Sequence, residues 1–366
     1  MDVLSRAHAL ERAGRRVVHM EIGEPDFTAP APVVEAGVRA LREGRTAYTA
    51  TLGLPALREA IAAHYAHKFS TAVDAARVVV TAGASGGLLT VMALYVDAGD
   101  EVLVPDPGYP GYRHFVRVFE GRARALAVSA AGNFQPTLEM VRAAWSLRTK
   151  GLVLGSPSNP TGTLIAKSEL QAIAAFIAER GGVLIVDEIY QGLSYGVEPW
   201  TALGLPGEVV VINSFSKYFC MTGWRLGWAV LPPEAVRGFE KLAQHLFICA
   251  PAAAQYAACA AFDAESLQVL EERRREFARR RDFLLPQLTS AGLAVPAEPH
   301  GAFYIYADCL RDSRGFCLQL LEKEAVAATP GVDFGANGTD RYVRFAYTRA
   351  MADLEEAASR IKRFAA

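Results

Sequence analysis

The chain has 366 residues, which is more than one ordinary hydrophobic core supports, so about two domains are expected. It is 51% hydrophobic and 21% charged, and its formal net charge at pH 7 is −1. This near balance of charges excludes an electrostatic basis for binding nucleic acid or an anionic membrane surface. We therefore expect a globular enzyme that acts on small molecules.

The N-terminal residues and the cysteines predict a cytoplasmic protein. Residues 2–16 carry six charged side chains and no apolar run of the kind found in secretory signals. The five cysteines form no C-x-x-C pair, so reduced thiols are expected, and neither a disulfide framework nor a metal site is predicted. The most apolar stretch, 242–262, contains Gln244, His245 and Gln255, and a buried helix broken at Pro251 is expected there rather than a membrane span.

Short apolar runs alternate with helical patterns along the middle of the chain. Such alternation predicts an α/β fold in which helices cover both faces of a mostly parallel sheet. Ligands of such sheets bind beyond the carboxyl ends of the strands, where the polar clusters of this chain also lie. Strands are predicted at 78–81, 101–104, 151–154, 183–187 and 208–213, and a helix at 168–179 with Ser168 as its N-cap.

The pattern changes after residue 262. A charged helix is predicted over 271–281, and the alternating segments 301–306 and 341–347 indicate strands of a smaller α+β domain. The N-terminal segment is expected to pack there as well, which makes the smaller domain discontinuous. We predict a large domain over residues 38–270 and a small domain formed by residues 1–37 and 271–366.

The strongest chemical signal is residues 214–227, SFSKYFCMTGWRLG, which follow the last of these apolar strands. Lysine is costly to bury because its charge must be desolvated. Beside another cation such as Arg225, a desolvated Lys217 has a lowered pKa and becomes a nucleophile toward carbonyls. The hydroxyls of Ser214 and Ser216 and the guanidinium suit a phosphate. Pyridoxal phosphate carries both an aldehyde and a phosphate and fits this segment.

Five other polar or aromatic residues each have a structural and a functional interpretation. Asp187 either caps a helix or pairs with the pyridinium nitrogen of the cofactor. Asn159 and Tyr190 either shape turns or donate hydrogen bonds to its phenolic oxygen. Tyr109 either packs in a turn or stacks on the cofactor ring. Arg344 either forms an exposed salt bridge or binds a substrate carboxylate with both arms of its guanidinium.

A Gly-rich turn at residues 83–87 joins a predicted strand to a helix. Exposed backbone N–H groups and the helix dipole make this turn a phosphate cradle. The same residues spell G-x-S-x-G, the nucleophile turn of α/β-hydrolases, and a hydrolase using Ser85 is therefore an alternative. Its triad partners would be Asp187 with His245 or His300. This alternative leaves the lysine segment unexplained.

Taken together, these motifs resemble the class I/II aminotransferases, which are fold-type I pyridoxal-phosphate enzymes related to aspartate aminotransferase. The resemblance covers nearly the whole chain and is most specific at S-x-S-K, residues 214–217. Its other motifs are IGEPDF at 22–27, YTATLGLPAL at 48–57, GAS at 83–85, NPTG at 159–162, D-x-x-Y at 187–190, R-x-G at 225–227, PGVDFG at 330–335 and the arginine at 344.

The resemblance implies a role for each matched residue. Lys217 forms the Schiff base with pyridoxal phosphate and shuttles the substrate's Cα proton, and Asp187 holds the pyridinium nitrogen. Arg344 binds the substrate's α-carboxylate. The remaining implied cofactor contacts are Gly83, Ala84, Ser85, Tyr109, Asn159, Tyr190, Ser214, Ser216, Arg225 and Tyr48 of the partner subunit in a homodimer. The remaining implied substrate contacts are Gly23 and Asn159.

The implied activity is transfer of an amino group between an L-amino acid and a 2-keto acid by a ping-pong Schiff-base mechanism. A carbon–sulfur β-eliminating lyase built on the same lysine is the alternative within this chemistry. The aminotransferase-like effector domain of certain bacterial regulators is a non-catalytic alternative. Those regulators carry an N-terminal helix-turn-helix, and only residues 1–21 precede the first motif here. No residue matches the arginine of dicarboxylate-specific members, so neutral apolar or aromatic amino acids are expected to outrank aspartate.

Overall fold

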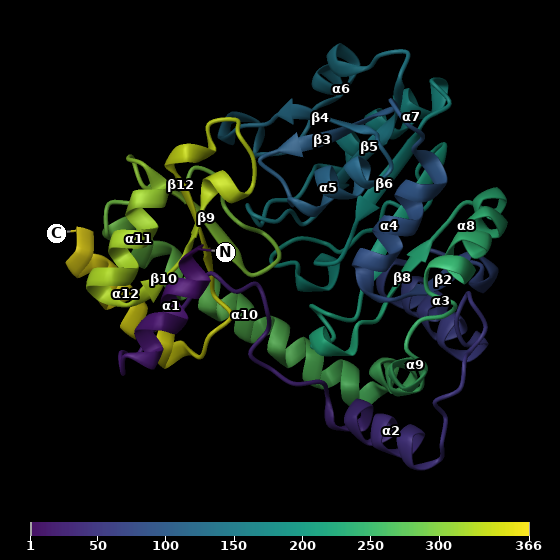
Figure 1. The fold of residues 1–366 in the computed structure, drawn as a ribbon, viewed down its shortest axis with the longest axis horizontal. Helices are drawn as coiled ribbons and strands as arrows, with labels where there is room; N and C mark the ends of the chain where they lie inside the picture. The colour runs from purple at the N-terminus through teal and green to yellow at the C-terminus, as the bar shows by residue number, and fades with distance from the viewer. Residues whose placement is uncertain (1, 366) are drawn as a thin grey trace.

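The computed structural model describes residues 2–365, and a seven-stranded sheet lies at its centre (Figure 1). The strand order is β2-β8-β7-β6-β5-β3-β4. All neighbouring pairs are parallel except those made by β8, which runs antiparallel to β2 and β7. The strands are β2 (Val78–Thr81), β3 (Glu101–Asp106), β4 (Arg122–Ala127), β5 (Thr149–Gly155), β6 (Val183–Asp187), β7 (Glu208–Ser214) and β8 (Gly227–Val230). The predicted mostly parallel sheet is confirmed.

Both faces of this sheet are buried, as the continuous apolar runs predict. In β7, Val209 and Val211 belong to one hydrophobic cluster, whereas Val210 and Ile212 belong to another. Alternate residues of a strand point to opposite faces, so the two clusters cover the two sides. One side is packed by α4 (Gly83–Tyr95), α5 (Gly111–Val118) and α8 (Pro233–Leu246). The other is packed by α3 (Pro55–Phe69), α6 (Leu138–Ala144), α7 (Lys167–Glu179) and α9 (Ala252–Cys259).

The last part of the chain forms a smaller antiparallel sheet of order β11-β12-β9. Its strands are β9 (Tyr304–Asp308), β11 (Thr329–Pro330) and β12 (Tyr342–Ala346), and the helices beside it are α11 (Ser313–Glu324) and α12 (Met351–Ala365). The N-terminal segment joins this part, since β1 (Val18–His19) pairs in parallel with β10 (Val326–Ala327) and α1 (Asp2–Arg12) lies against α11. Figure 1 shows the purple N-terminal helix beside the yellow C-terminal ones.

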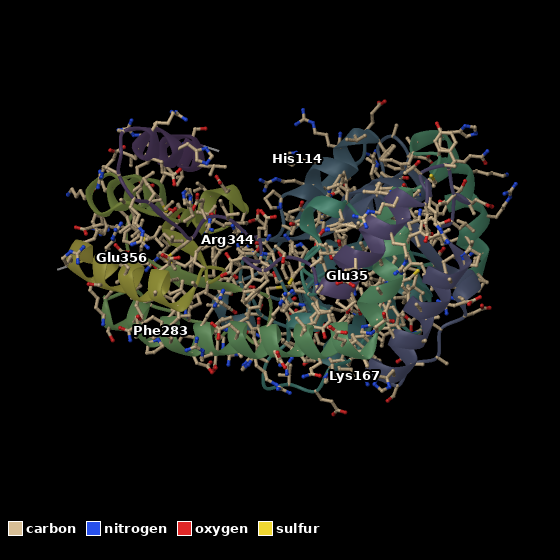
Figure 2. All side chains as sticks on the ribbon, turned by 90° about the horizontal axis from the view of Figure 1, so that it is seen from below. Glu35, His114, Lys167, Phe283, Arg344 and Glu356 are labelled. Atoms are coloured by element: carbon tan, nitrogen blue, oxygen red, sulfur yellow. The ribbon has the colours of Figure 1, made fainter. Side chains whose placement is uncertain are left out.

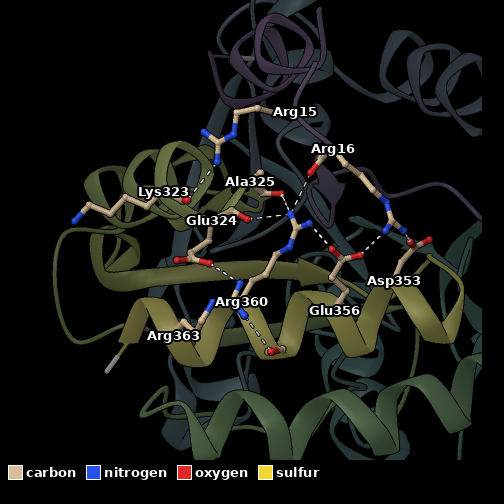
Figure 3. Close-up of polar contacts among 10 residues, drawn as sticks. Arg15, Arg16, Lys323, Glu324, Ala325, Asp353, Glu356, Arg360 and Arg363 are labelled. Carbon is tan, nitrogen blue, oxygen red and sulfur yellow. Dashed lines mark hydrogen bonds and ion pairs between the residues drawn. The ribbon is translucent and has the colours of Figure 1, made fainter. Parts of the chain in front are cut away.

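An arginine of α12 ties these two distant segments together (Figure 3). Arg360 Nη1 donates to the backbone carbonyls of Arg16, Glu324 and Ala325 at 3.1, 3.0 and 3.2 Å. The N-terminal segment therefore packs on the C-terminal part, as the sequence predicts. The predicted boundaries at 37/38 and 270/271 fall inside α2 (Ala31–Arg42) and the 27-residue α10 (Ala264–Ser290), and the exact division stays a proposal.

Local details differ from the sequence-based expectations in two places. Helix α7 begins at Lys167 after Ala166, so Ser168 lies inside the first turn and is not the N-cap. The strand predicted at 301–306 begins only at Tyr304, because Ala302 adopts a left-handed φ of 56° that interrupts the extended backbone. The break at Pro251 is confirmed between α8 and α9. Among residues 2–365, no helix combines the length and apolar character needed to cross a bilayer.

Short 3-10 helices complete the structure and lie mostly at the ends of strands. Two of them border the polar residues discussed next, η3 after β6 and η4 before β8. The full set is η1 (Ala75–Arg77), η2 (Ala130–Gly132), η3 (Gln191–Leu193), η4 (Thr222–Trp224), η5 (Ala260–Phe262), η6 (Gly331–Asp333) and η7 (Thr339–Arg341).

Candidate active site

A cavity of about 260 Å³ lies beyond the carboxyl ends of β5, β6 and β7, where parallel sheets bind ligands. It receives side chains from both the central sheet and the smaller sheet. In Figure 2 the labelled Arg344 lies between the C-terminal helices and the larger part of the molecule. The predicted residues that line the cavity are Gly23, Ala84, Ser85, Tyr109, Asn159, Asp187, Tyr190, Lys217 and Arg344.

Lys217 follows β7 and extends into this cavity. Its Nζ donates to the backbone carbonyl of Gly23 at 2.6 Å. Burial, together with the positive charges of Arg344 and Arg225, lowers the pKa of Lys217 to about 8, although the carboxylate of Glu24 opposes this shift. A large fraction of the amine is therefore neutral near pH 8, which is the state that a nucleophile or a base requires.

Asp187 is the last residue of β6, and it is buried and lines the same cavity. Its Oδ2 accepts a hydrogen bond from the Tyr112 hydroxyl at 2.8 Å, and its Oδ1 accepts one from the backbone N–H of Ile189 at 3.1 Å. Burial raises the pKa of Asp187 to about 6, and these two hydrogen bonds and the charge of Lys217 limit that rise. The carboxylate is thus mostly ionised at pH 7 in an apolar setting, where a cationic partner is strongly favoured.

Arg344 of β12 fixes the orientation of Asn159. Arg344 Nη1 donates to Asn159 Oδ1 at 2.9 Å, and Nη2 donates to the carbonyl of Glu21 at 2.6 Å. The guanidinium is buried between two rings, with its carbon 4.3 Å from the Tyr304 centroid and 4.9 Å from that of Phe334. Since the amide oxygen of Asn159 is engaged by the arginine, its Nδ2 is left as a donor to a ligand.

Two tyrosines meet beside this amide. The hydroxyls of Tyr190 and Tyr304 lie 2.7 Å apart, and both rings are buried. Tyr109 sits at another wall, where its ring packs edge-on against Tyr112 at 5.3 Å. An aromatic face and two hydroxyls therefore border the cavity near the carboxylate of Asp187. The sequence did not predict the hydrogen bond of Tyr112, although this residue stands three positions after Tyr109 on the first turn of α5.

The N-terminus of α4 and the guanidinium of Arg225 form a positively polarised corner beside the cavity. No side chain caps α4, so its first N–H groups are free to bind a ligand. Gly83 makes the close approach possible, since a Cβ there would lie 2.6 Å from Arg225 Nη2. Ser214 Oγ lies 3.0 Å from Ser216 Oγ on the same side. These residues flank the cavity, whereas Ala84 and Ser85 line it.

Tyr48 stands apart from this site. It is 79% exposed and does not line the cavity of its own chain. The histidines proposed for a hydrolase triad are also elsewhere. His245 is exposed on α8, His300 lies next to Gly301, and no histidine from the described part of the chain lines the cavity that contains Ser85. The structure therefore does not assemble the hydrolase triad.

Comparison with known proteins identifies the family. A family model described as aminotransferase class I and II matches residues 15–361. The chain belongs to the class I and II aminotransferase family. The matched region includes every motif that the sequence analysis singled out, from residue 22 to Arg344, so the resemblance inferred from these motifs is confirmed.

Individual aminotransferases match over nearly their whole length. The chain is 38% identical to (5-formylfuran-3-yl)methyl phosphate transaminase of Methanocaldococcus jannaschii, over 100% of this chain and 95% of that protein. It is also 38% identical to valine–pyruvate aminotransferase of Mycobacterium tuberculosis, over 99% and 94%. A crystal structure of an aminotransferase from Mycobacterium tuberculosis superposes with a TM-score of 0.95 at 38% identity, over 100% of this chain and 95% of that one. These aminotransferases give no support to the lyase or hydrolase alternatives.

Proposed function

We propose that the protein is a pyridoxal-phosphate-dependent aminotransferase that moves an amino group between an L-amino acid and a 2-keto acid. The observation that carries this proposal is the shared cavity of Lys217 and Asp187. A buried amine with a pKa of about 8 and a buried carboxylate with a pKa of about 6 face one space. Opposite shifts of this kind are typical of sites that handle protons near neutral pH.

The residues around the cavity fit pyridoxal phosphate. Its phosphate suits the uncapped N-terminus of α4 and the guanidinium of Arg225. Its ring nitrogen suits Asp187, and its phenolic oxygen suits Nδ2 of Asn159 and the hydroxyl of Tyr190. Tyr109 offers a ring face. When bound, the cofactor supplies a carbonyl carbon that condenses with amines and a ring that draws in the electrons released at the substrate's Cα.

The chain's own residues supply positioning and proton transfer. Arg344 binds the substrate's α-carboxylate with the two arms of its guanidinium. Lys217, in its neutral form, accepts the proton released at Cα and later returns a proton, so its lowered pKa matches the task. Asp187 keeps a positive charge on the ring nitrogen, because an ionised carboxylate in a buried site favours a cationic partner.

A screen of single half-reactions tests the proposal. The purified holoenzyme is mixed with each L-amino acid in the absence of any keto acid, and keto acid and ammonia are both measured. An aminotransferase releases at most one equivalent of keto acid per subunit and no ammonia, with a lasting change in the cofactor's visible spectrum. Continuous ammonia release from any amino acid at a comparable rate would show a lyase and overturn the proposal.

We expect neutral apolar or aromatic amino acids to be the preferred donors. Arg344 is the single arginine among the described residues that line the cavity, and it is assigned to the α-carboxylate. Tyr109 and Tyr304 offer apolar ring surface for the substrate's side chain. The two relatives named above carry different substrates in their names, so they favour neither class. A kinetic panel in which aspartate or glutamate exceeds every neutral donor tenfold would contradict this preference.

Arg344→Lys is expected to raise the Michaelis constants of amino-acid and keto-acid substrates together. Lysine keeps the charge but loses the planar fork and its second hydrogen bond, and a charge-assisted hydrogen bond contributes roughly 1.5–3 kcal/mol. The expected increase is therefore about 10- to 100-fold. Primary amines without a carboxylate serve as the control and are expected to react at similar rates in both proteins. An equal loss for amines and amino acids would remove the carboxylate role from Arg344.

We further propose that the enzyme works as a homodimer. Exposed large apolar side chains gather on α2, in the loop after it and in the segment that joins α8 to α9. They are Val34, Val38, Leu41, Tyr48, Leu246, Phe247 and Ile248. Helices α2 and α9 pack against each other, which brings these segments to one region. A clustered apolar surface of this kind is characteristic of protein–protein interfaces.

Mixing of two defective variants tests whether Tyr48 acts on the partner subunit's site. Lys217→Ala and Tyr48→Phe homodimers carry one lesion in every site. If Tyr48 serves the neighbouring site, a mixed dimer has one site with both lesions and one with neither. Activity after subunit exchange should then exceed that of either parent. Exchange verified by mass spectrometry without any gain would place Tyr48 outside the partner's site.

A further inference from the structure

A second cavity, of about 310 Å³, lies near the candidate active site and is lined by different residues. It is formed by the end of α3, the segment around η3 and the first part of α10. Its charged residues are Lys68, Glu271 and Arg274, and no other acidic or basic side chain of residues 2–365 lines it. Two cations and one carboxylate leave the cavity with a net positive charge.

Both oxygens of the cavity's single carboxylate, Glu271, already accept hydrogen bonds. Glu271 Oε1 accepts from Lys68 Nζ at 3.1 Å and from the Tyr218 hydroxyl at 2.7 Å, and Oε2 accepts from Arg274 Nε at 2.7 Å. Both cations therefore flank a single carboxylate that neutralises only one of them. The side chains of Lys68 and Arg274 are 18% and 27% exposed. Water therefore hydrates the uncompensated positive charge only in part.

Several hydrogen-bonding groups at the cavity wall are unused. Arg274 Nη1 donates to the carbonyl of Ser194 at 3.1 Å, but Nη2 has no hydrogen-bond partner in the described part of the chain. Lys68 Nζ has one acceptor and retains further N–H groups. Gln191 is 4% exposed, and its Oε1 is buried without a partner among residues 2–365. Most buried polar groups in proteins have a hydrogen-bond partner, so this unpaired oxygen beside two cations calls for an explanation.

This cavity and the active site share two short backbone segments. Tyr190 lines the active site, and Gln191, the next residue, lines the second cavity. Lys217 lines the active site, and the ring of Tyr218, the next residue, lies 4.1 Å from Lys68 Nζ. Gly192 packs on Tyr218 so closely that a Cβ would lie 2.4 Å from the ring. A ligand that moves Lys68 or Gln191 therefore acts on the backbone next to Lys217 or Tyr190.

We propose that the second cavity is a regulatory binding site for a small oxyanion. A carboxylate or phosphate group would bind to Lys68 and Arg274 and neutralise the unbalanced charge, and the amide of Gln191 would hold a polar group of the same ligand. Burial of Lys68 lowers its pKa, since desolvation disfavours its charge, and a bound anion would restore the usual value. The regulatory part of this proposal rests on the proposed aminotransferase activity, whereas the binding part does not.

Calorimetry with two probes tests the binding. Malonate and inorganic phosphate are titrated into the Arg344→Gln holoenzyme, which lacks the arginine proposed to bind carboxylates in the active site. The two probes distinguish a carboxylate ligand from a phosphate ligand. We expect saturable binding of at least one probe. Adding Lys68→Met, which keeps the apolar stem, should raise its dissociation constant tenfold or more. Arg237→Gln is the matched control, because Arg237 also pairs with a glutamate but is 71% exposed on α8, and it should change the constant less than twofold.

A second variant keeps the test decisive if Lys68→Met folds poorly. Val197 lines the cavity and is 39% exposed, and Val197→Trp fills the space without changing any charge. It should weaken the same probe at least tenfold. For regulation, the probe should change kcat twofold or more at saturating amino acid and keto acid, and this change should vanish in Val197→Trp. Absent binding, or binding that both variants leave intact, would overturn the site, and binding without a change in kcat would overturn its regulatory role.

Discussion

Lys217→Ala is expected to lower turnover by about 10⁴-fold or more, because it removes both the nucleophile and the base of the proposed reaction. The variant should still fold and hold the cofactor, since the contacts at α4, Arg225 and Asp187 do not involve the lysine. It should lose the visible absorbance of the lysine-linked cofactor and the covalent label formed on borohydride reduction. Turnover and the label would be measured on the same preparation.

Lys241→Ala provides the control for this change. Lys241 is exposed on α8, outside both cavities, and its replacement should leave turnover and the borohydride label unchanged. A borohydride-stable link to another lysine in the Lys217→Ala protein would mean that the nucleophile was misassigned.

The pH dependence of Lys217 follows from its burial. A pKa lowered to about 8 means that the neutral amine becomes the major form above pH 8, whereas an ordinary lysine reaches this point near 10.5. The labelling rate of Lys217 in the cofactor-free protein by an amine-specific reagent should rise with pH and level off above about 8. A free lysine derivative with a blocked α-amino group, labelled in the same sample, should show no plateau below pH 9, because the ordinary lysine pKa is about 10.4. Identical pH profiles of labelling for the two amines would show that the pKa of Lys217 is not lowered.

Asp187→Asn is expected to lower turnover by about 10²–10³-fold, the size of effect seen when one preorganised electrostatic partner is removed from a buried site. The amide has nearly the same shape, so cofactor binding should persist. What is lost is the charge that holds a proton on the ring nitrogen. Asp187→Glu keeps the charge and should recover part of the loss, which a simple structural cap would not require.

Glu188 offers a matched control for Asp187. It is the next residue and is also buried, but it accepts hydrogen bonds from Thr201 and Ala202 and does not line the cavity. Burial raises its pKa to about 8, so it is mostly protonated at pH 7 and Glu188→Gln should change turnover little. Tyr112→Phe should have an intermediate effect, because it removes one hydrogen bond from Asp187 and raises the pKa of that carboxyl. Equal losses in Asp187→Asn and Glu188→Gln would indicate a folding defect only.

The parts of the site that could be predicted from the sequence are mainly charged residues that stand directly at the end of an apolar strand. A lysine directly after an apolar strand stands out because burying its charge is costly, and the structure places Lys217 in the cavity. Asp187 at the end of β6 was singled out by its spacing to Tyr190 and Lys217, since an aspartate after a strand is by itself an ordinary helix cap. The parallel sheet was predictable because runs such as 209–212 are apolar on both faces.

Other contacts depend on tertiary packing and left no signal in the sequence. The hydroxyl of Tyr112 reaches Asp187 only because α5 packs on the central sheet, against β3 and β4, and nothing in the sequence around this tyrosine indicates its partner. The Arg344–Asn159 pair joins residues 185 positions apart, so no local spacing encodes it. The second cavity was missed because Lys68 of α3 lies far in sequence from Glu271 and Arg274 of α10, and all three are ordinary helix-surface residues in sequence. The prediction of Ser168 as an N-cap was wrong because α7 begins at Lys167, so Ala166 occupies the N-cap position.

The reversed direction of β8 bears on the order in which the contacts of the site form during folding. Because β8 pairs antiparallel with β7, the connection over residues 215–226 returns to the strand end that it left, so Lys217 and Arg225 belong to one local segment of the chain. The contact of Arg344 with Glu21 instead joins residues 323 positions apart and requires both ends of the chain to meet. Local contacts form early and distant ones late, so the segment that holds Lys217 and Arg225 should be structured before Arg344 reaches Glu21. Under the proposed function, the folding chain would therefore position its reactive lysine before it completes the carboxylate-binding part of the site.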